Sequence, residues 1–567
     1  MMENRKSFIY SLLLCFISGI ILGCFYLFHI QHIVVAYDEI AMKMIAAGEL
    51  SNKCEPYMIF HNIGIGFLVS GLYKIVNWIE WYEVLLLFCL FFALFAFFYR
   101  INQFVIHFNK KNYIAVVAYS FLFFVFMFYE SFVLLRFTYC AMITGVVFLF
   151  FYFSKCKLDY VDYFISLVLL LLCFSIREDI FKMILPYLCI FLAFKLIRGN
   201  FDKVELGYWI IVITCILGLS LGDRFAYQEE WKDAKEINGI RASMQDYGCV
   251  PEFESNLDVY EDLELTYWDY YVLRMTYWGL SDHLNLETLT ALNSVNIEKN
   301  TSLKNESLSE QIQFFNAHKS DISKLILLAD LLLVVCNIYL LLKDRSKLSW
   351  LLYCGILFLW VAEWWYLIYG GNLPYRVSYS MHVLFCFCNV TNALLVCQKS
   401  EKITSFYEFF KKKTSFIFFI GLVILFFCLM LVRIYKVCIS NEQNYETNKS
   451  FYVLEKYMEK NEDKSYICFV NEYCDELDII NQQKNNYTKM TGWIGETPSW
   501  QSFLKGDYST KVEALANRTD LYFVTVENDE SPLFLEEYLK EKGYNVKYDY
   551  EIVSFEGIKY WIWSLAN

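Results

Sequence analysis

The sequence predicts a polytopic α-helical membrane protein with a small α/β domain at its C-terminal end. Of the 567 residues, 57% are hydrophobic and 19% are aromatic, whereas a soluble chain is roughly 45–50% apolar. The excess lies in long runs with almost no charge, and about eleven of these runs are long enough, or nearly so, to cross a bilayer. After the last run, segments of alternating apolar residues indicate strands separated by a helix.

The apolar runs define the expected membrane spans. They centre on residues 8–30, 84–99, 113–129, 138–153, 161–175, 180–194, 207–222, 323–342, 348–369, 379–397 and 415–434. Several are shorter than the ~20 residues that a straight span needs. Most of the 19 cysteines lie inside these runs, where a cysteine behaves as a small buried apolar residue.

The charges between the runs predict the orientation of the chain. Alternate connections carry clusters of lysine and arginine, for example Lys411–Lys413, and the short loops between them carry one arginine each: Arg136, Arg177 and Arg376. By the positive-inside rule the clusters are cytoplasmic. We therefore expect the N-terminus inside the cell and the C-terminal domain outside.

This topology divides the chain into two domains. Residues 1–435 form the transmembrane domain, with external loops at 31–83 and 223–321, and residues 436–567 form the extracytoplasmic α/β domain. Within the first loop, the apolar and aromatic run from Tyr57 to Trp81 is broken by His61, Asn62, Lys74 and Asn77, which suits a helix lying in the membrane interface. The second loop is acidic and rich in tyrosine, and we expect it to be partly helical.

The expected C-terminal domain contains both helical and strand-like segments. In order, these are a helix near Phe451–Lys460, strands at Tyr466 and Leu521, an amphipathic segment from Leu533 to Lys542, and alternating apolar positions through Trp563. Such alternation predicts a small α/β domain. Cys468 and Cys474 lie within it and could form a disulfide if the compartment is oxidising.

Composition also excludes some functions. The formal net charge is −12, and no basic stripe is available to neutralise phosphates, which argues against nucleic-acid binding. The expected partners are instead the lipid bilayer and molecules that reach its outer face.

Charged residues gather at the predicted non-cytoplasmic ends of the spans. They are Asp38, Glu39, Glu130, Arg136, Arg177, Glu178, Asp179, Glu363 and Arg376. Acids and arginines at a membrane boundary are costly unless they are paired, hydrated or used. If the helix ends converge, these residues form one site that contains both carboxylates and guanidinium groups.

Such a mixture suits the transfer of a sugar from a lipid-linked phosphate donor. A carboxylate can act as general base on an acceptor hydroxyl. A second pair of acids can hold a divalent cation, Mg²⁺ or Mn²⁺, through oxygen ligands. Arginines can bind the phosphate leaving group through bidentate, permanently charged donors.

One segment resembles a known family. Tyr37-Asp38-Glu39, followed by Ala41, Met44, Ala46, Ala47 and Gly48, looks like the opening of the first external loop in GT-C glycosyltransferases, the polyprenyl-phosphate-sugar-dependent enzymes of the family-39 type. Those polytopic enzymes place an acidic pair after the first span, followed by a short helix that ends near a glycine and by juxtamembrane helices. The run from Tyr57 to Trp81 takes the position of these helices, although Glu55-Pro56-Tyr57 replaces the usual His-Pro-Leu type of turn.

The resemblance implies a GT-C-like fold and assigns roles to particular residues. The first acid of the pair, Asp38, corresponds to the catalytic base or a metal ligand, with Glu39 beside it. The later external acidic motif, which binds metal or substrate, matches Glu178–Asp179 or Glu130. Arg376 is the candidate for the lipid-phosphate contact.

Three further residues complete the expected substrate site: Arg177, Tyr375 and His61. Simpler roles remain open for several candidates. Arg177, Glu178 and Asp179 could be a salt-bridge cluster in a tight loop, and Arg376 could extend to the lipid headgroups. His61 could be a packed histidine, and Glu130 a structural acid.

We therefore expect a glycosyltransferase that moves a sugar from a polyprenyl-phosphate donor to an envelope glycan, lipid or protein acceptor on the outer face of the cell membrane. An envelope-polysaccharide polymerase or ligase is the alternative enzyme. A lipid or oligosaccharide transporter (flippase) is the non-enzymatic alternative, and it would require ionisable residues inside the spans, of which Glu363 is a borderline case.

Overall fold

The computed structural model of the chain describes most residues between 34 and 566. The described ranges are 34–108, 127–155, 157–199, 201–246, 250–299, 321–344, 346–369, 374–399, 413–470, 474–476, 486–490 and 492–566, together with isolated positions between 9 and 20 and at 309 and 313. The expected spans at 8–30 and 113–129 therefore lie largely outside the described residues.

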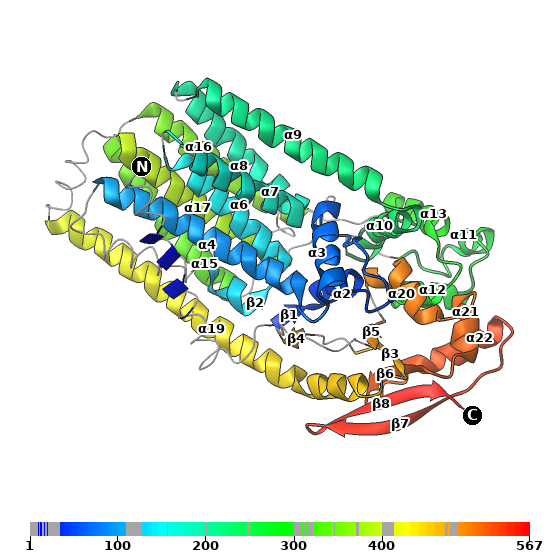
Figure 1. Ribbon diagram of the computed structural model, residues 1–567. Coiled ribbons are helices and arrows are strands. Elements are labelled where there is room, and N and C mark those ends of the chain that lie inside the picture. Colours follow the sequence, from blue (N-terminus) through cyan, green and yellow to red (C-terminus); the bar gives the residue numbers. More distant parts are fainter. Residues whose placement is uncertain are drawn as a thin grey trace.

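Long helices form a bundle at one end of the elongated molecule (Figure 1). Six described helices are long and apolar enough to cross a membrane: α4 (Trp81–Phe108), α8 (Glu178–Ile197), α9 (Lys203–Ala226), α15 (Asp321–Asp344), α16 (Lys347–Tyr369) and α17 (Tyr375–Lys399). They coincide with predicted spans. The fold is therefore compatible with a membrane protein, and the described residues carry six candidate spans.

Two shorter apolar helices lie among the long ones. These are α6 (Phe137–Phe153) and α7 (Tyr160–Ile176), with 17 residues each. Every side chain of α6 is buried, and the helix packs against α4, α7, α8 and α17. Gly145 permits the contact with α8, because a Cβ there would lie 2.1 Å from Ile184 Cδ1. The helix α6 is thus the centre of the bundle.

The longest helix connects the bundle to the C-terminal domain. It is α19 (Lys413–Glu459), with 47 residues, and at 1.5 Å per residue it is roughly 70 Å long. Figure 1 shows it running along the bundle and ending beside the C-terminal sheet. The helix passes without a break through position 435, where the sequence predicts a domain boundary. The fall in hydropathy at that point marks a change of surroundings and not the end of the helix.

The predicted C-terminal sheet is confirmed. Its five strands lie in the order β5 (Tyr487–Lys489), β3 (Ser465–Cys468), β6 (Leu521–Val526), β8 (Ile558–Leu565) and β7 (Tyr548–Phe555). The first three are mutually parallel, and β8 is antiparallel to both of its neighbours. Cys468 is buried with a free thiol, and the side chain of Cys474 lies outside the described residues.

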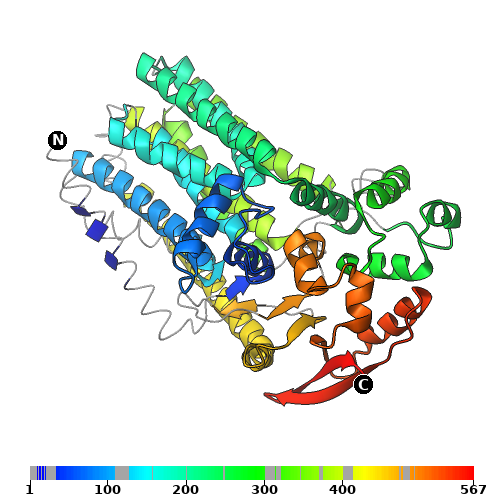
Figure 2. The same cartoon turned by 45° about the vertical axis from the view of Figure 1, so that its right-hand side comes forward.

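The segment expected to be the second external loop is helical. Its elements are α10 (Glu229–Arg241), α11 (Leu257–Asp262), α12 (Tyr267–Arg274), η3 (Trp278–Leu280) and α13 (Leu286–Lys299). These α10–α13 helices pack on the C-terminal domain at the end of the molecule away from the bundle (Figure 2). The C-terminal domain contributes α20 (Pro498–Lys505), α21 (Lys511–Asn517) and α22 (Phe534–Glu541).

A second small sheet lies where the bundle meets the C-terminal domain. Its central strand β1 (Val34–Ala36) pairs in parallel with β2 (Leu134–Leu135) and antiparallel with β4 (Cys474–Glu476). Helix α2 (Tyr37–Ala47) begins directly after β1, and α6 begins soon after β2. Pairing of the strands therefore brings the first turn of α2 beside the start of α6.

Candidate functional site

The acidic pair lies in the first turn of α2, where carboxylates interact favourably with the helix dipole. Glu39 is buried, and its Oε1 accepts a hydrogen bond from the backbone N–H of Phe137 at 3.0 Å. Asp38 is half-buried, and its Oδ1 accepts from the indole N–H of Trp493 at 3.0 Å. Trp493 belongs to η5 (Trp493–Glu496) in the C-terminal domain. The two acids therefore face different partners.

Burial changes the protonation of Glu39. Loss of solvent, followed by the negative charge of Asp38, raises the pKa of Glu39 to about 7, against the opposing charge of Arg136. Its Oε2 is buried and has no hydrogen-bond partner among the described residues. Glu39 is thus partly protonated at neutral pH.

Arg177 occupies the turn between α7 and α8. Its guanidinium lies 4.9 Å from the ring centroid of Phe137 and 5.8 Å from that of Phe60. Its Nη1 donates to Thr138 Oγ1 at 3.1 Å. These contacts fix the guanidinium against the start of α6, beside the acidic pair.

The surroundings of Arg177 connect the predicted site residues. Burial lowers the pKa of Arg177, and the nearby charge of Arg376 lowers it further, while the charges of Asp179, Asp38 and Glu39 oppose both effects. The structure therefore brings Asp38, Glu39, Asp179 and Arg376 within electrostatic range of the Arg177 guanidinium. Asp179 is largely exposed and pairs with Lys182. We call the other four residues, Asp38, Glu39, Arg177 and Arg376, the acid–arginine cluster.

Arg376 lies in the first turn of α17 and is half-buried. Among the described residues, no hydrogen bond or ion pair to its guanidinium is present, although its backbone carbonyl accepts from Ser380. An arginine with free donors beside a fixed arginine can bind an anion with several oxygens.

Glu130 and Tyr375 belong to a different cluster. Glu130 is buried and accepts hydrogen bonds from Tyr139 at 3.1 Å and Tyr375 at 2.9 Å. It also pairs with Arg433 of α19 at 2.6 Å. With these donors Glu130 is well satisfied, and its carboxylate joins α6, α17 and α19.

Glu178 and Asp179 are at the surface of the first turn of α8. Their side chains are 59% and 71% exposed and pair with Lys182 at 3.1 Å and 3.5 Å. Asp179 also lies 3.9 Å from Arg177. Across the described ranges, no group of three or more histidine, cysteine, aspartate or glutamate side chains could hold a metal ion. Asp179 acts on the charge of Arg177, as Asp38 does, but the exposure of both carboxylates and their pairing with Lys182 do not favour the expected metal site.

His61 is enclosed by protein. Its Nδ1–H donates to the carbonyl of Ile176 at 2.6 Å, and its Nε2 accepts from the hydroxyl of Tyr82 at 2.9 Å. Burial lowers the pKa of His61 to about 4, so the ring is neutral at physiological pH. Since both nitrogens are occupied, the role of His61 in this conformation is to hold the loop before α3 (Ile63–Ile75) against α7.

A cavity of about 150 Å³ opens beside the cluster. Its lining includes Phe60, Asn62, Arg177, Asp179 and Lys235. The cavity thus adjoins the fixed guanidinium and is bordered by both acidic and basic side chains.

The structure brings two further residues to the site: Trp493, which the sequence did not indicate, and Arg136, a span-end arginine for which the sequence favours a structural role. Trp493 contacts Asp38 and packs edge-on against Phe60, with ring centroids 5.2 Å apart. Arg136 starts α6, and its charge acts on Glu39. Arg136 was visible as a loop arginine, whereas nothing in the sequence near Trp493 indicates contact with a residue 455 positions away.

Ionisable residues also occur inside the candidate spans. Asp330 of α15 bonds to His382 of α17, and Tyr187 of α8 donates to Glu363 of α16 at 3.1 Å. Asp330 and His382 lie inside predicted spans, which were expected to be nearly free of ionisable residues.

The acid–arginine cluster can perform two chemical tasks. Asp38 is a carboxylate with one oxygen held by a neutral donor, so its other oxygen can accept a proton. Arg177 and Arg376 can bind and stabilise an anionic leaving group. Comparisons of the chain with protein-family models, curated proteins and solved structures gave no match.

Proposed function

We propose that this chain is a GT-C-like membrane glycosyltransferase that transfers a sugar from a polyprenyl-phosphate donor to a cell-envelope acceptor on the outer face of the membrane. The observation that carries the proposal is the acid–arginine cluster. Three separate segments contribute to it: the start of α2, the α7–α8 turn and the start of α17. A carboxylate and two arginines at one end of an apolar bundle suit a reaction between a polar acceptor and a lipid phosphate.

Asp38 is the proposed general base. It removes the proton from the acceptor hydroxyl while that oxygen bonds to the anomeric carbon and the bond from this carbon to the phosphate oxygen breaks. The hydrogen bond from Trp493 fixes the orientation of the carboxylate. The C-terminal domain thereby contributes to the site, although it holds none of the charged residues of the cluster.

The two arginines receive the departing polyprenyl phosphate. Arg177 is held by its aromatic neighbours and Thr138, and the guanidinium of Arg376 has no partner among the described residues. Fixed charge at the position where negative charge develops lowers the barrier most. Glu178 and Asp179 are solvent-exposed and paired with Lys182, so the proposed reaction assigns them no role in holding a divalent cation.

The direct test uses the purified full-length chain in lipid nanodiscs. A set of polyprenyl-phosphate donors that differ in their sugar is incubated with the enzyme and an envelope-glycan extract. Release of polyprenyl phosphate is followed by mass spectrometry. Asp38→Asn should abolish release without loss of folded protein. The matched control, Asp507→Asn in the exposed loop after α20, should behave as wild type. No release by the wild-type chain from any donor, or full release by Asp38→Asn, would overturn the proposal.

A transporter of lipids or oligosaccharides is the second candidate. The buried Asp330–His382 pair and Glu363 favour it, because ionisable residues inside spans commonly mark transport pathways. Asp330→Asn separates the two functions. It should stop the movement of a fluorescent polyprenyl-linked sugar across proteoliposomes if the chain is a transporter, whereas Asp38→Asn should not.

A further inference from the structure

A second cavity, of about 580 Å³, lies between the α10–α13 helices and the C-terminal domain. Its volume is within the range of ordinary ligand pockets. The lining is mostly polar and includes Asp233, Asn285, Glu496, Gln501 and Tyr508. We infer that this cavity binds a neutral, hydroxyl-rich carbohydrate chain, which is the acceptor glycan if the proposed function is correct.

Glu496 gives the cavity an unused polar group. Its side chain is only 6% exposed, Lys511 lies 3.7 Å from its Oε2, and its Oε1 has no hydrogen-bond partner among the described residues. A buried oxygen without a partner is costly, and a ligand hydroxyl would satisfy it. Burial also raises the pKa of Glu496 to about 7, so the carboxyl group can both donate and accept hydrogen bonds near neutral pH. A sugar hydroxyl, which does the same, is a matching partner.

The remaining lining favours carbohydrate over other ligands. Asn285 and Gln501 supply amides, and the half-buried ring of Tyr508 supplies an apolar face. The lining carries four acidic side chains, Glu230, Asp233, Asp282 and Glu496, against two lysines, Lys505 and Lys511, and this excess of acids disfavours phosphates and other anions. Amides, a carboxyl group and an aromatic ring together suit a polyhydroxylated ring with polar edges and apolar faces.

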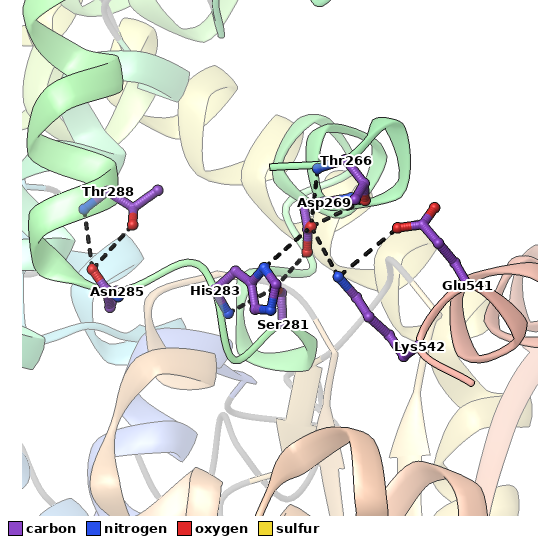
Figure 3. A network of polar contacts seen from close by, with 8 residues as sticks. All are labelled: Thr266, Asp269, Ser281, His283, Asn285, Thr288, Glu541 and Lys542. Carbon is purple, nitrogen blue, oxygen red and sulfur yellow. Dashed lines mark hydrogen bonds and ion pairs between the residues drawn. The ribbon is translucent and has the colours of Figure 1, made fainter. Parts of the chain in front are cut away.

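The wall formed by residues 281–285 is held rigidly (Figure 3). The fully buried Asp269 accepts hydrogen bonds from Ser281 at 2.7 Å and from Lys542 of α22 at 3.3 Å. Asn285 in turn accepts from the backbone N–H of Thr288 at 3.0 Å. The bond from Lys542 connects the α10–α13 helices to the C-terminal domain, and the other two bonds hold the segment from Ser281 to Thr288 in place.

The cavity is connected to the acid–arginine cluster through η5. Trp493 at one end of this short helix bonds to Asp38, and Glu496 at its other end lines the cavity. At about 2 Å per residue these two positions are separated by roughly 6 Å along the helix. A chain held in the cavity is therefore close to the proposed base, as an acceptor glycan must be.

Saturation-transfer NMR on the full-length protein in nanodiscs tests the inference without any donor. The probes are neutral hexasaccharides of glucose, N-acetylglucosamine and mannose. At least one should bind to the wild-type chain. Ser502→Trp, at an exposed position of α20 that lines the cavity, should weaken binding at least tenfold, and Glu496→Gln should weaken it less. Glu537→Trp, at an exposed position of α22 outside the cavity, should bind as wild type.

Two results would overturn the inference: no saturation-transfer signal from any of the hexasaccharides with the wild-type chain, or unchanged hexasaccharide binding by Ser502→Trp. The outcome is separable from that of the proposed function. Asp38→Asn should keep hexasaccharide binding while losing sugar transfer. If binding is present but the wild-type chain consumes no donor, the carbohydrate site stands and the transferase proposal fails.

Discussion

At the scale of single residues, the hydrogen bond from Trp493 to Asp38 is the most informative contact. It joins residues from opposite ends of the chain, and it fixes one oxygen of the proposed base. A group that positions a base, without touching the substrate, should affect the rate of the chemical step more than substrate binding.

Trp493→Phe tests this role. Phenylalanine keeps the aromatic packing against Phe60 but removes the N–H donor. Since hydrogen bonds to charged groups contribute about 1.5–3 kcal/mol, we expect kcat to fall by about tenfold or more. KM for the donor and the thermal stability should change little. A change in KM with constant kcat would show that Trp493 contacts the substrate instead.

Arg376→Ala should weaken the interaction with the departing phosphate, whereas Arg376→Lys keeps the charge but loses the bidentate geometry. Loss of a charged hydrogen-bond donor predicts a decrease in kcat/KM of about 10- to 100-fold for alanine, and lysine should restore part of it. Kinetics of donor consumption measure both variants. Equal activity of the alanine variant and the wild type would exclude Arg376 from the site.

The raised pKa of Glu39 predicts a dependence of stability on pH. The native state holds the proton up to a pKa of about 7, above the ordinary value of 4.5, so stability should decrease as the pH rises from 4.5 through 7. Glu39→Gln removes this ionisation and can still accept the bond from Phe137. The variant should therefore raise the melting temperature by a few degrees at pH 8 and by much less at pH 5. Equal effects at the two pH values would contradict the assignment.

At the scale of elements, a buried ion pair fastens α19 to the bundle. Glu130 and Arg433 are each only 1% exposed, and Tyr139 and Tyr375 donate to the same carboxylate. The pair therefore joins three helices through one carboxyl group.

Arg433→Met should be strongly destabilising, because it leaves the Glu130 charge buried without its cation. The expected cost is about 3–5 kcal/mol. The double variant Glu130→Gln/Arg433→Met should recover a large part of this loss, since no buried charge remains. Thermal unfolding in detergent compares the three proteins. A double variant as unstable as the sum of the single variants would show that the two residues act independently.

Sequence patterns identify most elements but not all of their boundaries. The C-terminal strands and the apolar helices follow directly from alternation and from runs of apolar residues, as at Leu521–Val526 and Glu178–Ile197. The continuity of α19 was missed, because polar residues replace apolar ones after Lys436 while the backbone remains helical. The change from apolar to polar residues was thus taken for the end of the helix.

At the scale of the whole molecule, close packing of backbones joins the α10–α13 helices to the C-terminal domain. Gly279 of η3 faces η5, and a Cβ at this position would lie 2.6 Å from the carbonyl oxygen of Gly495 and 2.6 Å from the ring of Trp500. Gly495 is two residues from Trp493. Displacement of η5 would therefore reach Asp38.

Gly279→Ala should loosen this junction and reduce sugar transfer, although the residue touches no member of the acid–arginine cluster. Hydrogen exchange should increase in η5 and α20. The matched control is Gly207→Ala on α9, where a Cβ would meet nothing within 4 Å. Unchanged exchange in η5 would contradict the proposed coupling.

The candidate site could be predicted in part. The sequence identified Asp38, Glu39, Arg177 and Arg376, because acids and arginines at span ends are unusual enough to be noticed one at a time. It could not separate them from Glu130 and Tyr375, which are at similar positions, although Glu130 pairs with Arg433 and Tyr375 donates to Glu130. The sequence can estimate how deep in the membrane the end of a span lies. It cannot show which residues lie beside that end, because this depends on how the helices are arranged around α6.

The unbroken α19 has a mechanical consequence. The helix contains no proline and a single glycine, Gly421, so it is a stiff lever anchored in the bundle at one end and in the sheet at the other. A small tilt of its N-terminal part, in the bundle, becomes a larger sideways displacement of its C-terminal part, beside the sheet. Bilayer thickness or tension, acting only on the N-terminal part, could in this way move the domain that carries Trp493 toward or away from Asp38.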